Sequence, residues 1–342
     1  MAPPMNRAFS GIRPTGRAHI GNYLGAMLNY VALQKDYECI YCIVDVHALT
    51  TLEETELLQK NIYEMALDLF AAGLSPEKSI IFVQSHVPEV MTLHTLLSMV
   101  TPLGWLMRVP TFKEKVREIA KSPSVNSVDE LALGDEHINY GLLGYPVLMT
   151  ADIVLYKANY VPVGEDQLPH LELAREIVRR FNNKFGDTFP EPQPRLTPTR
   201  LILGLDGKSK MSKSLNNHIE LASTPEETRK RVLTAVTDPQ RQRRTDPGRP
   251  EVCNVFTLHK TFSPNRVAEI DRRCRTADIG CVDCKGILAD NINAYFAEFR
   301  DRRRKLAEDP KRIQDILADG ASRARTIASA TVKEVEQRMG LA

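Results

Sequence analysis

The sequence predicts an α/β protein: a doubly wound parallel sheet in the front two thirds, followed by an all-helical last third. Three observations support this. Short apolar runs, typical of strands buried on both faces, alternate with amphipathic helical stretches in the first half. From residue 225 onward the pattern is almost wholly helical. The length of 342 residues is enough for two domains of the usual ~100–200 residues.

The first half is built from strand–helix units. A short strand runs into a Gly/Pro turn, a helix follows, and two more strands flank an amphipathic helix that ends at Gly73. In order, these segments are 7–16, 21–35, 39–50, 54–74 and 78–85. Ligands of such sheets bind at the carboxyl ends of the strands.

The next part contains a helical insertion at 97–145, which we expect to separate the two halves of the sheet. A helix and a strand are predicted within 145–167, and a further helix over 168–185. The proline-rich segment 189–200 predicts a loop, and "LILGL" at 201–205 a strand. Thr224 is placed to cap the first helix of the last third, with Pro225 at its first position.

Composition and charge narrow the function classes. No apolar run approaches the ~18–20 residues that span a bilayer, and arginines interrupt the N-terminal segment where a signal peptide would lie, so we expect a cytoplasmic protein without membrane contact.

Residues 1–224 carry 21 Lys and Arg against 25 Asp and Glu, whereas residues 225–342 carry 24 against 18. This difference suits a small-molecule site joined to a surface for an anionic macromolecule, and equally suits ordinary helical charge scatter.

The six cysteines fall into two groups. Cys39 and Cys42 lie three apart on a predicted strand, so their side chains face opposite sides and cannot share a metal. The second group has the spacing C-x20-C-x6-C-x2-C. Four thiolates in one region meet the ligand count of structural zinc or of a [4Fe–4S] cluster, although zinc sites usually show two close CxxC pairs and one is present here. The members of this group are Cys253, Cys274, Cys281 and Cys284.

Two short stretches point to a bound nucleotide. "GIRPTGRAHIGN" (11–22) is a turn of low bulk that opens a helix, where a phosphate can approach the backbone, and His19 and Asn22 lie i, i+3. "GKSKMSKSLNN" (207–217) concentrates lysines without helical or strand periodicity. It is either a solvated turn or a mobile clamp for a polyphosphate.

The pair "HIGN" and "KMSKS" resembles the two signatures of class I aminoacyl-tRNA synthetases. "VDVHALT", "VPTFKEK", "YPVLMTADIVLYKANYVPVGEDQ" and the cysteine-containing tail extend the resemblance to the bacterial tryptophanyl-tRNA synthetases, over about residues 9–340. The resemblance implies a Rossmann-like catalytic domain at 6–215, with a dimer contact in the insertion. It also implies a helical anticodon-binding domain at 216–342, whose last helix packs back on the catalytic domain.

The implied enzyme is a homodimeric tryptophan–tRNA ligase that uses ATP with Mg²⁺, L-tryptophan and tRNA(Trp). Lys210 and Lys213, with Lys115 from the insertion, would hold the leaving pyrophosphate, and His19 would assist at the nucleotide. ATP would also contact Arg13, Pro14, Thr15, Gly21, Asn22, Gly164, Glu165, Asp166, Ile202, Met211, Ser212 and Ser214. Arg13 departs from the pattern, because many family members have Gln at that position.

The resemblance also implies a tryptophan pocket centred on Asp152. A lone carboxylate among apolar side chains is costly unless paired, and an indole N–H would satisfy it. A site built to bond an N–H rejects ligands that lack it by as much as ~10⁴–10⁵. Gln167 would hold the ammonium group. The other pocket residues would be Phe9, Gly11, His47, Tyr145, Met149, Ile153, Val161 and Val163.

The last third resembles the subset of these synthetases that carries a [4Fe–4S] cluster, which we favour over Zn²⁺ for the four cysteines. The stretches "RQRR" (241–244) and "FRDRRRK" (299–305) are suited to contact RNA phosphates, or form solvated helix faces. Three other functions compete: a tyrosyl-tRNA synthetase, a paralogue that binds tRNA or senses tryptophan without productive aminoacylation, and a small nucleotidyltransferase.

Overall fold

The computed structural model describes residues 6–52, 54–119, 138–196 and 202–342. At its centre is a five-stranded sheet of order β3-β2-β1-β4-β5, in which every neighbouring pair is parallel. The strand order reverses between β1 and β4, the point where such sheets bind ligands. This confirms the predicted fold class. The strands are β1 (Arg7–Ile12), β2 (Glu38–Ile43), β3 (Ser79–Val83), β4 (Tyr160–Val163) and β5 (Gln193–Leu196).

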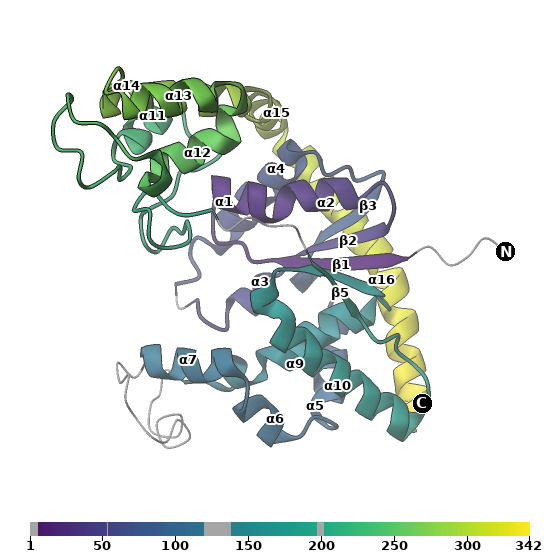
Figure 1. Ribbon diagram of the computed structural model, residues 1–342. Helices are drawn as coiled ribbons and strands as arrows, with labels where there is room; N and C mark the ends of the chain where they lie inside the picture. The colour runs from purple at the N-terminus through teal and green to yellow at the C-terminus, as the bar shows by residue number, and fades with distance from the viewer. Residues whose placement is uncertain (1–5, 53, 120–137, 197–201) are drawn as a thin grey trace.

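Helices cover both faces of the sheet (Figure 1). The first crossover starts as α1 (Ile20–Asn22), passes through one π-helical turn and continues as α2 (Leu28–Leu33); α4 (Leu58–Ala72) lies on the same face. The opposite face is covered by α5 (Glu89–Ser98), α9 (Tyr140–Leu155) and α10 (Leu168–Phe185). Cys39 and Cys42 belong to the cores on opposite faces, as their spacing predicts.

The prediction for the segment before the lysine stretch is wrong in two respects. The proline-rich stretch contributes β5, whereas residues 202–205 lie outside the sheet and Leu203 makes an isolated antiparallel bridge with Lys210. β5 pairs with β4 at the edge of the sheet. Proline is tolerated there because one side of an edge strand makes no ladder hydrogen bonds.

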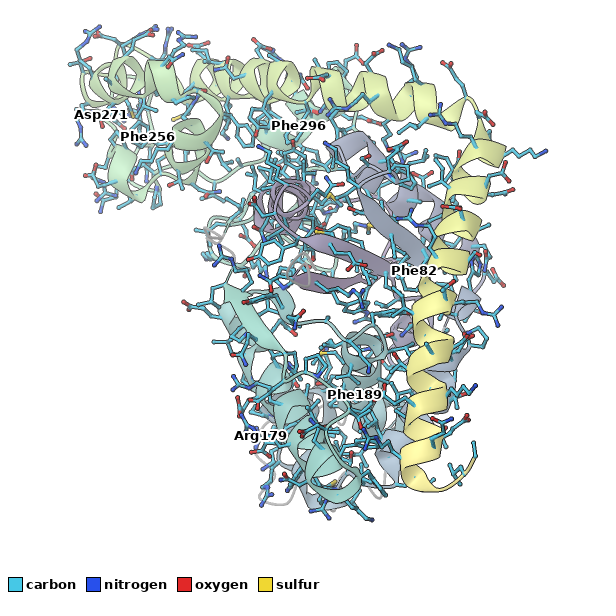
Figure 2. The ribbon with its side chains drawn as sticks, turned by 90° about the vertical axis from the view of Figure 1, so that its right-hand side faces the viewer. Phe82, Arg179, Phe189, Phe256, Asp271 and Phe296 are labelled. Carbon is cyan, nitrogen blue, oxygen red and sulfur yellow. The ribbon has the colours of Figure 1, made fainter. Side chains whose placement is uncertain are left out.

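The helical domain comprises five helices after residue 224, and a sixth returns to the sheet. Thr224 and Glu227 form a reciprocal capping box with Pro225 in the first turn, as predicted. Figures 1 and 2 show the last helix running alongside the sheet, where a Cβ at Gly320 would overlap the Ile81 carbonyl oxygen. The helices are α11 (Pro225–Leu233), α12 (Asn254–Phe262), α13 (Val267–Arg275), α14 (Cys281–Tyr295), α15 (Ala297–Ala307) and α16 (Pro310–Met339).

The insertion supplies α6 (Leu103–Met107) and α7 (Pro110–Ile119) after α5, and its residues 120–137 lie outside the described part. None of the helices described is both long and apolar enough to span a bilayer.

Candidate active site

A cavity of about 290 Å³ lies where the strand order reverses. Phe9 and Gly11 come from β1, and Val161 and Val163 from β4. The remaining walls come from the turn after β1, the first crossover helix, the segment after β2, α9 and the start of α10. The packing allows no Cβ at Gly11, because one would lie 2.9 Å from Val44. The predicted residues that line this cavity together are Phe9, Gly11, Arg13, His47, Met149, Asp152, Ile153, Val161, Val163, Gly164 and Gln167.

Asp152 is a fully buried acid that lines this cavity, and its side chain is held by an amide. Gln84 Nε2 donates to both carboxylate oxygens, at 2.9 and 2.7 Å. Burial, opposed by this hydrogen bond and reinforced by the charge of Asp45, raises the pKa of Asp152 to about 8. Sequence reasoning missed Gln84. The available signal was a polar residue one position beyond a buried strand, next to the strand that leads to His47.

Tyr145 lies behind the cavity wall in a hydroxyl–imidazole network. Its hydroxyl is 2.5 Å from Thr111 Oγ1 and 2.7 Å from His170 Nε2, and its ring packs edge-on against His47 at 5.6 Å. Burial, with Arg13 and His170 nearby, lowers the pKa of His47 to about 4, so His47 is neutral at pH 7. Thr111 and His170, which the sequence did not single out, tie the pocket to α7 and α10.

The turn that precedes α1 is stabilised by His19 and Asn22. The Nδ1 atom of His19 accepts from the Asn22 amide at 3.3 Å, and Asn22 Oδ1 accepts from the His19 amide at 3.1 Å. The two side chains therefore bond each other's backbone. Burial, the His218 ring and the two lysines of the KMSKS stretch lower the pKa of His19 to about 4. Gly21 is tightly packed against the His19 ring, and Gly16 has φ +88°, which favours glycine.

The segment directly after the lysine stretch is joined to this turn by main-chain hydrogen bonds. Ile20 donates to the Ile219 carbonyl at 3.0 Å, and Leu221 donates to the Ala18 carbonyl at 2.9 Å. Lys213 Nζ reaches the Thr15 carbonyl at 2.7 Å, across 198 residues of sequence, and burial lowers its pKa. An ammonium group is therefore placed at the glycine turn, where an anion is expected.

The remaining residues predicted to contact ATP lie around this contact between the lysine stretch and the glycine turn. Met211 is buried beneath the stretch, whereas Lys210 and Ser214 are exposed. Ser212 and Ser214 share a hydrogen bond of 2.8 Å between their hydroxyls. The other residues predicted to contact ATP are Pro14 beside Thr15, the partly buried Ile202, and Glu165 with Asp166 in the turn after β4. The side chain of Asp166 lies outside the described part.

Comparisons with known proteins agree with this geometry. The family model described as "tRNA synthetases class I (W and Y)" matches residues 4–297. The chain belongs to this family. Two similar relatives are the tryptophan–tRNA ligases of Deinococcus radiodurans, 45% identical over 98% of this chain and 99% of the relative, and of Aquifex aeolicus, 39% identical over 98% and 100%. The crystal structure of tryptophanyl-tRNA synthetase from Campylobacter jejuni, complexed with ADP and tryptophan, has a TM-score of 0.86 and 35% identity, covering 98% of this chain and 100% of that one.

In this class I synthetase, Lys115 lies on α7 with its ammonium group 2.5 Å from Glu118 on the same helix. Both side chains are largely exposed to solvent. Thr111 is one turn earlier on α7, so the helix that carries Lys115 is anchored to the pocket network.

The four cysteines of the synthetase's helical domain lie near the start of α12, on α13 and in the first turn of α14. Burial, reinforced by the charges of the other three thiols and opposed by Arg241, raises the pKa of Cys284 to about 12. Arg241 and His259 are the neighbours of these thiols, at 3.6 Å from Cys274 Sγ and 3.4 Å from Cys284 Sγ. Among the described residues, no three His, Cys, Asp or Glu side chains are arranged to hold a metal ion.

Two arginines of 299–305, Arg302 and Arg303, contact the α/β domain of the synthetase. Arg303 Nε donates to Asp68 Oδ1 at 2.6 Å and its Nη2 pairs with Glu64, leaving the side chain 11% exposed. Arg302 donates to the Ala71 carbonyl at 2.8 Å. The expectation that these arginines contact RNA phosphates is therefore wrong for Arg303, whose guanidinium is occupied inside the protein.

Proposed function

We propose that this synthetase is a tryptophan–tRNA ligase, which activates L-tryptophan with ATP and transfers the aminoacyl group to tRNA(Trp). The observation that carries the proposal is a buried carboxylate lining a cavity at the strand switch point. The whole-length relatives that bear this name support the same assignment.

Asp152 selects the amino acid in this proposal. Its carboxyl group accepts the indole N–H, and a substrate without that donor leaves a buried acceptor without its hydrogen bond. Tyr145 supports the ring pocket from behind its wall, and the wall itself is formed by Phe9, Gly11, His47, Met149, Ile153, Val161 and Val163. Gln167, at the mouth of the cavity, holds the ammonium group of the substrate.

In the activation step, a carboxylate oxygen of tryptophan attacks the α-phosphorus of ATP. A new P–O bond forms while the bond to pyrophosphate breaks and its electrons leave with the pyrophosphate. Lys210 and Lys213 stabilise that departing charge, and α7 brings Lys115 towards it. Mg²⁺ enters with ATP and supplies further positive charge to the phosphates.

The ATP itself is held at the joined turns. The adenosine and phosphates lie against the Gly16–Gly21 turn, where His19 and Asn22 fix the backbone, and against Ile202, Met211, Ser212 and Ser214. Arg13, Pro14 and Thr15 border the same space, and Gly164, Glu165 and Asp166 close it from β4. A neutral His19 suits this place because it can donate to a phosphate and accept from the backbone at once.

Amino-acid-dependent ATP–pyrophosphate exchange tests the assignment when tryptophan and tyrosine are compared. We expect exchange with tryptophan, and exchange with tyrosine alone would overturn the proposal. Replacing Lys210 and Lys213 together by Ala lowers the exchange rate by at least about 10³-fold, because pyrophosphate loses its preorganised cations. The matched control is the exposed Lys208, which lies two residues before Lys210 and five before Lys213 and is expected to tolerate Ala.

We also propose that Cys253, Cys274, Cys281 and Cys284 hold a [4Fe–4S] cluster, with Zn²⁺ as the alternative. The four cysteines come from α13, from α14 and from the residue that precedes α12, and the clustering of these helices in sequence and in the helical domain supports a shared site. When bound, such a group cross-links α12, α13 and α14. Protein purified without oxygen should contain iron and acid-labile sulfide in stoichiometric amounts, and a colourless protein with one zinc would overturn the iron–sulfur assignment.

We further propose a cytoplasmic homodimer whose contact lies in the insertion. Met99 and Leu103 there are 69% and 64% exposed, which is a large apolar exposure for one short segment. Replacing both by Lys should shift the protein from dimer to monomer in analytical ultracentrifugation. A wild-type monomer would refute this assembly.

A further inference from the structure

Gln84 is a buried amide side chain that has no role in the proposed function. It follows β3 directly, is 1% exposed, and is absent from the lining of the cavity. Its side chain lies between the main chain of His47 and the carboxylate of Asp152. It therefore touches two elements of the pocket wall without touching the ligand space.

The orientation of this amide is fixed by its other partner. The backbone N–H of His47 can only donate, and it donates to Gln84 Oε1 at 3.0 Å. The NH₂ group must then point at Asp152, where it meets both oxygens. An amide flip would place a donor against a donor and an acceptor against an acceptor, so Asp152 always receives a donor from this side.

The surroundings of Asp152 make that donor important. The titratable groups that face it are Asp45 from α3 (Asp45–Ala48), Cys42 from β2 and Tyr156 from the end of α9, each of which is neutral or negative. Among the residues that the structure describes, Gln84 is the group that lowers the pKa of Asp152, against burial and Asp45. Without this hydrogen bond, burial and Asp45 would raise the pKa of Asp152 further and favour the protonated acid, which faces the ligand as a donor.

We infer that Gln84 is a positioning residue for indole recognition: its amide aims the Asp152 carboxylate and keeps it an acceptor for the ring N–H of tryptophan. The inference rests on the proposed function. Since Gln84 acts through Asp152, it changes the affinity for ligands with a ring N–H and leaves the chemistry at the phosphate untouched. Because Gln84 directly follows β3, the selectivity for tryptophan also depends on the position of this strand, which has no residue in the cavity wall.

The test compares Gln84→Met with the wild type in ATP–pyrophosphate exchange, using tryptophan and an analogue whose ring nitrogen is replaced by sulfur. Methionine matches the length of glutamine and offers no hydrogen bond. We expect the KM for tryptophan to rise about 10- to 100-fold with kcat nearly unchanged, and the KM for the sulfur analogue to change less than about 3-fold. A merely structural role would raise both KM values together. The matched control is Gln34→Met, since Gln34 also bridges backbone and side-chain groups, away from the cavity.

A second variant, Gln84→Glu, should show the opposite pH dependence of KM, and it keeps the inference testable if Gln84→Met does not fold. Gln84→Glu keeps the acceptor for His47 and loses the NH₂ group. Its KM for tryptophan should worsen as pH rises from 6 to 9, because two carboxylates then face each other, whereas the KM of Gln84→Met should improve as Asp152 ionises. Unchanged KM values in both variants would overturn the inference with the proposed function intact. A wild-type protein without tryptophan-dependent exchange would overturn the proposed function instead.

Discussion

Two regions of the synthetase each bury an aspartate, and they satisfy its charge in different ways. Asp68, at the seam between α4 and α15, is 0% exposed and is bound by the Arg303 guanidinium and by the Ala18 amide at 2.6 Å. Asp152, in the pocket, is 3% exposed and is held by the neutral amide of Gln84, with Asp45 adding repulsion. A buried charge with its own cation stabilises the protein's architecture. A buried carboxyl group that is held only by a neutral amide, beside a cavity, is suited to accept a hydrogen bond from a ligand.

The largest effect is expected at the seam. Replacing Arg303 by Leu leaves the buried Asp68 without its cation, whereas Glu64 keeps Arg17, and breaking a buried pair from one side costs about 3–5 kcal/mol of unfolding free energy. Urea denaturation measures this directly. Asp68 also bonds the amide of Ala18, next to His19, so the KM for ATP should rise in the same variant.

The control for this prediction is Arg304→Leu. Arg304 is largely exposed and pairs with Asp301 and Glu308 on its own helix, so its loss should cost less than about 1 kcal/mol. Adding Asp68→Asn to Arg303→Leu removes the stranded charge, keeps an acceptor for Ala18, and should restore much of the stability. Equal losses in Arg303→Leu and Arg304→Leu would show that the seam is not an electrostatic anchor.

The second prediction concerns pH at the pocket. The pKa of Asp152 is raised to about 8 in the fold, from the ordinary 3.8. Between these values the folded protein holds a proton that the unfolded chain has released, so this stability is complete below pH 4 and is lost as pH rises through 8. Asp152→Asn lacks the titration. It should therefore gain about 2–3 kcal/mol relative to the wild type between pH 5 and 9, less than the full shift implies because water can enter the cavity.

The measurement is the unfolding free energy of both proteins across that pH range, and parallel curves would contradict the raised pKa. The same variant should lose tryptophan binding at every pH. The single oxygen of Asn is required by the Gln84 NH₂ group, which leaves the Asn amide donor facing the indole N–H.

The contrast between these aspartates marks the limit of sequence reasoning. The Asp152 carboxylate was predicted because it sits among apolar side chains on a helical stretch, and the lysine stretch because it has no periodicity to explain its charge. Gln84 was missed, because its position one residue beyond a buried strand becomes informative only when β3 is known to lie beside β2. Arg303 was misinterpreted for a similar reason: its acidic partner is 235 residues away, and a run of arginines in sequence resembles a solvated or RNA-facing surface.

The proline-rich edge strand shows the same limit in the fold. The propensity of Pro194 argues against a strand, yet β4 offered a free edge that only the assembled sheet provides. By contrast, the Thr224–Pro225–Glu227 cap and the Gly73 helix end were predictable, because each depends on neighbours within a few residues.

The smallest effect is expected for Arg13→Gln, which asks whether the pocket aspartate has a cation after all. Arg13 lines the cavity, but its guanidinium bonds Thr51 Oγ1 at 2.5 Å and does not contribute to the pKa of Asp152. The variant should change the KM for tryptophan or ATP less than about 5-fold, and leave the pH midpoint of tryptophan binding where it is in the wild type. Isothermal titration of tryptophan from pH 6 to 9 provides both values. A midpoint that moves to higher pH would show that Arg13 is the electrostatic partner of Asp152. Asp152 would then be paired with a cation, as Asp68 is paired with Arg303, and would not require a hydrogen-bond donor from the ligand.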